Sequence, residues 1–146
     1  MAVSTTGYGL FHQSILEGRV NLDSDPVFMM LCNSSYVPNT DTHKFRSVVT
    51  NEIVGSGYTA GGQQVSGITK DYASKKLTIN GGPMNWPTVT WSDARYGVVY
   101  VAPIDIPITQ QPLVCFVDFG VGQNITDGPF YVTWPSTGII TMAWPS

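Results

Sequence analysis

Residues 26–33 read PVFMMLCN and contain the longest uninterrupted apolar run of the chain, Val27–Cys32. A short apolar run bounded by Pro and Asn is typical of a strand that is buried on both faces, at the centre of a sheet. The run is far shorter than the roughly 20 apolar residues that a membrane helix needs. We therefore expect a central strand here and no membrane span.

Several further segments are rich in β-branched and aromatic residues and are bounded by Gly, Pro, Asn or Asp. They are 66–70, 74–80, 88–91, 96–102, 113–119, 130–134 and 138–143. Asn80-Gly81-Gly82 is a strong turn signal, because Asn and Gly tolerate positive φ. This pattern predicts a mainly β chain, folded as a single-domain antiparallel β-sandwich or a jelly-roll-like barrel.

One short helix is expected near the start of the chain, at about residues 7–17. The side chains that share one face at helical spacing are Leu10, Phe11, Ser14 and Ile15. Thr5 or Thr6 is a candidate cap and Gly18 a stop signal. We expect this helix to pack on the sheet, with residues 1–9 as an N-terminal arm and 10–146 as the β-sandwich domain.

Two later segments are harder to assign. Phe45, Val48 and Val49 fit either one or two helical turns or an irregular loop. The segment 102–112 holds three prolines and the alternating residues Ile104, Ile106 and Ile108. Because proline fixes φ, we predict a stiff, extended connection there.

Charged residues make up 12% of the chain, about half the usual share of roughly 25%. The formal charge is −3 and only seven Lys and Arg are present, so no basic stripe is available for phosphates, and we expect no nucleic-acid partner. An uncharged polar surface suits contact with other proteins. The start of the chain lacks the charged and apolar regions of a signal peptide, which predicts a soluble chain that is not exported by a cleaved signal.

The search for chemistry yields no catalytic constellation. Residues 55–60, GSGYTA, match a loose dinucleotide fingerprint, but Gly61-Gly62 and a polar stretch follow where a helix should begin. We expect a glycine-rich loop. His12 and His43 are the only histidines, and no serine lies in a G-x-S-x-G elbow. We therefore predict that the chain is not an enzyme.

Metal and redox sites are not expected either. Asp23-Ser24-Asp25 and Asp41-Thr42-His43 lack the spacing of zinc or EF-hand sites and are better explained by turns and helix caps. Cys32 and Cys115 lie in apolar runs, which favours two free, buried thiols. No cofactor is predicted.

The four tryptophans divide into two pairs. Trp91 and Trp134 lie in strand patterns and are expected in the core. Trp86 and Trp144 are candidates for a carbohydrate-binding platform. Trp144 follows the last strand, where an aromatic residue often docks on a neighbouring subunit.

Taken in order, several segments resemble small structural proteins of tailed bacteriophages. The similar segments are VFMMLCNSSYVPNTDTH at 27–43, VTNEI at 49–53, GYTAGG at 57–62, VTWS at 89–92, ARYGVVY at 94–100, and the runs 112–120, 130–134 and 137–140. The resemblance implies a virion protein, a decoration or cement subunit on the capsid surface that binds the major capsid protein and often assembles as a trimer.

The chain departs from the family at 102–112, where the family has a short polar turn, so this segment is a candidate partner contact. The residues that we predict to contact other subunits are Tyr8, Ile104, Ile106, Ile108 and Trp144. The alternative is a tail or fibre component that binds a host-surface glycan through exposed Trp86 or Trp144.

Overall fold

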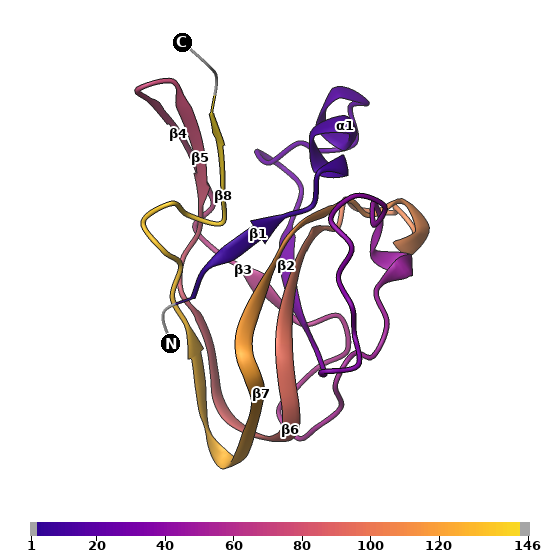
Figure 1. Cartoon of the computed structure of the whole chain (residues 1–146), viewed down its shortest axis with the longest axis vertical. Coiled ribbons are helices and arrows are strands. Elements are labelled where there is room, and N and C mark those ends of the chain that lie inside the picture. The colour runs from indigo at the N-terminus through magenta and orange to yellow at the C-terminus, as the bar shows by residue number, and fades with distance from the viewer. Residues whose placement is uncertain (1–2, 144–146) are drawn as a thin grey trace.

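The computed structural model describes residues 3–143 and confirms the mainly β fold, with two antiparallel sheets and a single α-helix in that range (Figure 1). The strands are β1 (Thr5–Gly7), β2 (Val27–Cys32), β3 (Gln63–Val65), β4 (Thr69–Ala73), β5 (Lys76–Asn80), β6 (Met84–Val101), β7 (Leu113–Val132) and β8 (Ile140–Ala143). The helices are α1 (Leu10–Leu16) and two 3₁₀ turns, η1 (Arg46–Val48) and η2 (Ile108–Gln110).

The larger sheet has the strand order β1-β7-β6-β2-β3. The predicted central strand is confirmed, since β2 pairs with both β6 and β3. Its side chains alternate between two buried clusters, with Met29 and Leu31 in one and Met30 and Cys32 in the other. Both faces of this sheet are therefore covered, as an all-apolar strand requires.

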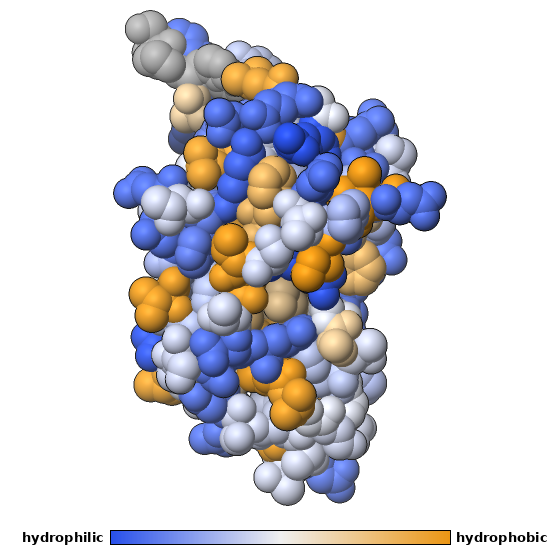
Figure 2. Space-filling view, turned by 90° about the vertical axis from the view of Figure 1, so that its right-hand side faces the viewer, coloured by the Kyte–Doolittle hydropathy of each residue, from blue (hydrophilic) through white to orange (hydrophobic). Residues whose placement is uncertain are grey.

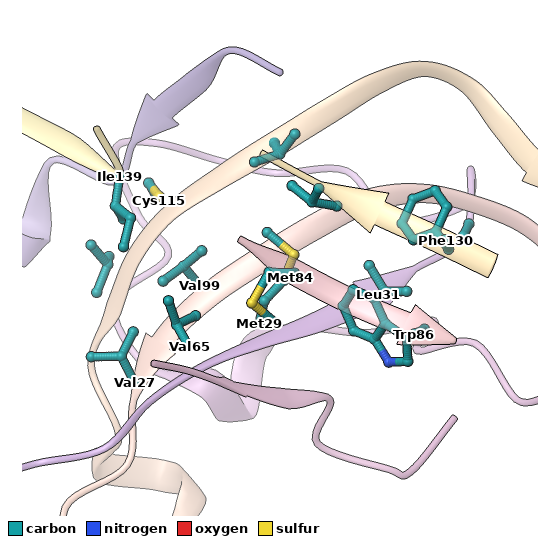
Figure 3. Close-up of a cluster of buried hydrophobic side chains, with 14 of the residues drawn as sticks. Val27, Met29, Leu31, Val65, Met84, Trp86, Val99, Cys115, Phe130 and Ile139 are labelled. Atoms are coloured by element: carbon teal, nitrogen blue, oxygen red, sulfur yellow. The ribbon is translucent and has the colours of Figure 1, made fainter. Parts of the chain in front are cut away.

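The long hairpin of β6 and β7 forms both layers of the sandwich. Its register shifts repeatedly between Trp86 and Tyr96, so the strands bend and their outer halves fold back over the sheet (Figure 1). In Figure 3, Met84 and Trp86 of the outer half face Met29 and Leu31 of β2.

The sequence had indicated four separate strands where β6 and β7 are each continuous, and that prediction was wrong. Pro87, Ser92-Asp93 and Gly120 read as strand ends, but the strands pass through them. Asp93 and Gly120 have φ values of 57° and 88°. These irregular residues mark bends within the strands and do not end them.

The smaller sheet has the order β4-β5-β8 and lies at the end of the molecule away from the bend of the long hairpin, beyond the start of β6 and the end of β7 (Figure 1). Strands β4 and β5 are joined by Ser74 and Lys75, both at positive φ. The predicted strand 74–80 therefore starts two residues later, because a turn without Gly or Asn was not recognised. The predicted turn after Asn80 does connect β5 to β6.

The N-terminal segment is part of the fold from Thr5 onward. Strand β1 pairs with β7, with Thr5 opposite Val117, and Tyr8 is fully buried. Residues 5–9 are thus not a free arm. The predicted threonine cap is also wrong, because these threonines lie in β1 and Gly9 begins the helix without a side-chain cap. Gly18, at φ +74°, follows the helix as expected.

The segment 102–112 is not extended. Ile106 N–H donates to the Pro103 carbonyl, Asp105 has a φ of 65°, and η2 follows. The prolines therefore stabilise a turn and not the extended connection that was predicted. The undecided trio at 45–49 contains η1, a single 3₁₀ turn.

Candidate functional site

An apolar groove lies between α1 and the smaller sheet, with a volume of about 450 Å³. From α1 and the turn after it, the lining residues are His12, Ile15, Leu16, Val20, Asn21, Leu22 and Asp23. From the sheet they are Lys70, Leu77, Ile79 and Met142. Most of these side chains are aliphatic, which is the usual composition of a binding site with a few polar groups at its edge.

Strand periodicity explains why the smaller sheet presents an apolar face to the groove. Leu77 and Ile79 alternate along β5, and Met142 lies directly opposite Leu77 on β8. The intervening residues, Thr78 and Thr141, are paired opposite each other on the other face. The sheet is therefore amphipathic, and its apolar face is the floor of the groove.

The helix side of the groove is incompletely covered. Leu16 is 88% exposed although it lines the groove, and Ile15 is half-buried. Lys70 and Asp23 form an ion pair that connects β4 to the turn after α1. Both partners are solvent-exposed, so this pair contributes little to closing the groove.

A second hollow, of about 530 Å³, continues from the groove around the end of α1. It shares Asn21 with the groove and is lined on its far side by Pro103, Ile106 and Gln110. Beyond it, η1 packs beside η2. Figure 2 shows apolar side chains scattered among polar ones on this side of the molecule.

The predicted contact residues fall in different places. Ile104 is 79% exposed and Ile108 49%, and together with exposed Val48 of η1 they form what we call the isoleucine ridge. Ile106 is half-buried in the second hollow. Tyr8 is interior and cannot touch a partner in this fold, which corrects its assignment as a contact residue. Trp144 lies outside the described residues.

Tyr8 belongs instead to a buried hydrogen-bonded chain. Its Oη lies 2.7 Å from Tyr36 Oη, which lies 3.1 Å from His43 Nδ1. Because Nδ1 also accepts from the Asn39 N–H, it carries no proton, so Tyr36 donates to His43 and Tyr8 donates to Tyr36. Burial lowers the pKa of His43 and raises that of Tyr36 to about 12. This chain fixes the loop after β2 against the sheet.

The glycine-rich loop is held by a second polar cluster. The Glu52 carboxylate accepts hydrogen bonds from Tyr58 Oη and from the Gly61 N–H, the latter at 2.7 Å. Tyr100 Oη donates to the Gly61 carbonyl. No helix begins at this loop, as expected from the sequence. The loop therefore lacks the helix N-terminus that binds the pyrophosphate in dinucleotide-binding proteins.

The cysteines and tryptophans are in the interior. Cys32 and Cys115 are free, as predicted, and burial raises the pKa of Cys32 to about 12. Trp91 is in the core as expected, and Trp134 is half-buried with its indole N–H donating to the Gly82 carbonyl. Trp86 is 3% exposed, so it is not available as a glycan platform.

Within residues 3–143, no three His, Cys, Asp or Glu side chains are grouped closely enough to share a metal ion. The same part of the chain contains no helix with the length and apolarity of a membrane span.

Sequence reasoning missed the groove. Its lining comes from α1, the turn after it and the strands β4, β5 and β8, and none of these segments contributes more than two apolar residues. The one available signal was the alternation of Leu77 and Ile79 in the predicted strand 74–80. Comparison of the chain with protein-family models, with curated proteins and with solved structures gave no match.

Proposed function

We propose that this chain is a structural protein of a tailed-phage virion, a decoration or cement subunit that binds the major capsid protein on the outside of the head. It acts by protein–protein contact and carries out no reaction. The resemblance of its ordered segments to small phage structural proteins supports the virion assignment.

The observation that carries the proposal is the apolar surface around α1. Leu16 in the groove and Ile104 on the isoleucine ridge are both more than three-quarters exposed, although each is a large aliphatic side chain. Exposed apolar surface rimmed by polar residues is typical of protein interaction sites. The groove and the ridge are connected through the second hollow, so one partner surface can cover both.

A cement subunit holds adjacent capsomers together by burying apolar surface on both sides of a seam. In our proposal the groove and the ridge contact neighbouring capsid subunits. Assembly as a closed trimer would place three copies of this surface around a three-fold or quasi-three-fold position of the shell.

The first test is the number of copies of this chain relative to the major capsid protein in purified particles, measured by quantitative mass spectrometry. A copy number close to a simple fraction of the capsid protein is expected for a subunit that decorates the whole shell. A copy number of a few per particle would place the chain in the tail, neck or fibre, and absence from the particle would overturn the virion assignment.

The second test asks whether the apolar surface is the binding surface. Leu16→Glu and Ile104→Glu place a charge on exposed side chains, so the fold should be retained while occupancy on expanded heads falls at least tenfold. Ser92→Glu, an exposed position near the bend of the long hairpin, is the matched control. Unchanged occupancy with both apolar variants would rule out this surface.

A further inference from the structure

Arg46 lies next to the isoleucine ridge. It is the first residue of η1, which also carries exposed Val48 of the ridge. The Arg46 N–H donates to the Gln111 carbonyl, and η1 packs beside η2, which begins with exposed Ile108. Arg46 and the ridge therefore belong to the same region of the molecule.

Two neighbours hold the Arg46 side chain in place. Its Cζ lies 4.7 Å from the centre of the Tyr100 ring, and its Nη1 donates to Gln111 Oε1 at 3.1 Å. Tyr100 is buried, and its Oη donates to the Gly61 carbonyl. Gln111 is also buried, and its Nε2 donates to the Ile106 carbonyl. Because the guanidinium is already oriented, it loses little freedom when it forms further hydrogen bonds.

The charge of Arg46 has no ion-pair partner within residues 3–143. The other two arginines of the chain are both paired. Arg19 contacts Glu17, and Arg95 donates to both carboxylate oxygens of Asp118 through Nε and Nη2. Arg46 is therefore the arginine of this fold that has a place for an acidic group from outside.

The donors of Arg46 suit a carboxylate. A guanidinium has five N–H donors, and the Arg46 side chain uses one of them within the described part of the chain. A carboxylate can accept two parallel N–H bonds from such a group. A Cβ added to Gly61 would lie 3.2 Å from Arg46 Nη2, and the Gly61 N–H donates to Glu52 at 2.7 Å. This nearby negative charge disfavours a phosphate, with almost two charges, more than a carboxylate with one.

We propose that Arg46 binds the carboxylate of an Asp or Glu side chain of the partner, while apolar residues of the partner cover Val48 and Ile108. This site deepens the proposed function and depends on it, since it requires an acidic residue among apolar ones on the capsid surface. Arginine is enriched among the residues that contribute most to binding at protein interfaces. Apolar contacts around the ion pair exclude water and so strengthen it.

The first experiment measures binding of the full chain to expanded heads. Arg46→Gln removes the charge and should weaken binding by about tenfold or more. Arg46→Lys keeps the charge without the forked donors and should recover only part of the loss. Arg95→Gln, in the long hairpin, also removes an arginine charge and is the matched control, with binding equal to that of the native chain. If circular dichroism shows folded proteins and Arg46→Gln binds like the native chain, the Arg46 site is overturned while the proposed function stands.

The second experiment needs no capsid protein and uses acetate as the carboxylate probe. The Nε–Hε signals of the arginines are followed in proton–nitrogen NMR spectra, with sodium chloride at equal ionic strength as the control. We expect a saturable shift at Arg46 and little change at Arg95, which Asp118 already occupies. Equal shifts at the two arginines would overturn the Arg46 site even if the chain binds heads. A shift at Arg46 in a chain that does not bind heads would overturn the proposed function and retain a carboxylate site.

The third experiment identifies the acidic residue by a double-mutant cycle. Surface Asp and Glu residues of the major capsid protein are replaced one at a time by Asn or Gln. The matching substitution should weaken binding of the native chain but should cause no further loss with Arg46→Gln. If every capsid substitution causes the same loss with both chains, Arg46 has no acidic partner on the capsid and the proposal is overturned.

Discussion

Both sheets contain a central strand with alternating side chains, but the two sheets differ in how completely the faces of that strand are covered. In the larger sheet, β2 is covered on both faces, with Leu31 and Cys32 each fully buried in a different cluster. In the smaller sheet, the central strand β5 has one apolar face, and α1 covers it only in part. All five residues of its neighbour β4 are exposed.

The larger sheet therefore contributes more to the stability of the fold, whereas the smaller sheet offers more surface for binding. The larger sheet contributes closely packed apolar surface, and each buried aliphatic side chain there is worth roughly 1.5–3 kcal/mol of transfer free energy. The smaller sheet leaves apolar surface uncovered, which stabilises the free chain less but is available for a binding partner. Single substitutions in the two sheets can test this contrast.

The close packing of the larger sheet is most sensitive at Gly62. This residue has a φ of 87°, and a Cβ there would overlap the Met29 carbonyl group. We expect Gly62→Ala to lower the free energy of unfolding by about 4 kcal/mol or more, since backbone would have to move. The matched control is Gly120→Ala, at a φ of 88° with no neighbouring atom within 4 Å, where only strain of about 1 kcal/mol is expected. Urea unfolding measures both, and equal losses would contradict the packing argument.

A pair of leucines compares the two sheets directly. Leu31→Ala in β2 should cost about 2–5 kcal/mol, because the side chain is fully buried and leaves a cavity. Leu77→Ala in β5 should cost about 1 kcal/mol, since that side chain is half-buried at the open groove. The midpoints of urea unfolding give the difference. A loss at Leu77 as large as that at Leu31 would mean that the smaller sheet is as closed as the larger one.

The loop that covers the second face of the larger sheet should respond to pH. Burial holds the pKa of His43 below its unfolded value of about 6.5. A depressed pKa contributes stability above the unfolded pKa, and this stability is lost as the pH falls through the folded pKa. Protonation of Nδ1 would also break its hydrogen bond from Tyr36. Unfolding measured between pH 7 and pH 5 should therefore show a smaller loss of stability in His43→Gln than in the native chain; equal slopes would exclude His43 as the group responsible.

The ion pair at the groove should have the smallest effect. Asp23→Asn removes the partner of Lys70, but both side chains are exposed, so we expect a change of less than about 0.5 kcal/mol that disappears at high salt. Thermal unfolding at low and high ionic strength measures it. A loss of more than about 2 kcal/mol would show that this ion pair, and not apolar contact, fastens the smaller sheet to α1.

The sequence predicted best where a local pattern decides the structure. The all-apolar run of β2, the helix over Leu10–Leu16 and the glycine-rich loop depend on periodicity or on turn chemistry, and all three are present. The prediction failed where tertiary contacts override local signals. The strands β6 and β7 continue through Pro87 and Gly120 because cross-strand pairing and bulges outweigh those breakers.

The candidate site was only partly predictable. Ile104 and Ile108 were singled out because isoleucines alternate in 102–112, where the chain departs from the phage proteins that it resembles, and both side chains are exposed. Tyr8 was wrongly predicted to be a contact residue. Its hydrogen-bond partner, Tyr36, is 28 residues away in the sequence, so no local pattern shows that Tyr8 is buried. The groove was missed because residues such as Leu16 and Met142 become neighbours only when α1 and β8 are placed by the fold.

Native-state amide hydrogen exchange tests the contrast between the sheets most directly, because β5 and β2 are both central strands with hydrogen-bonded neighbours on each side. We predict that amides of β2 exchange only through global unfolding. Those of β5 should exchange through a local opening that requires several kcal/mol less, as expected for an element with fewer buried apolar contacts. Equal free energies of exchange in β5 and β2 would contradict this account, since the smaller sheet would then be a closed part of the core and not an open surface for binding.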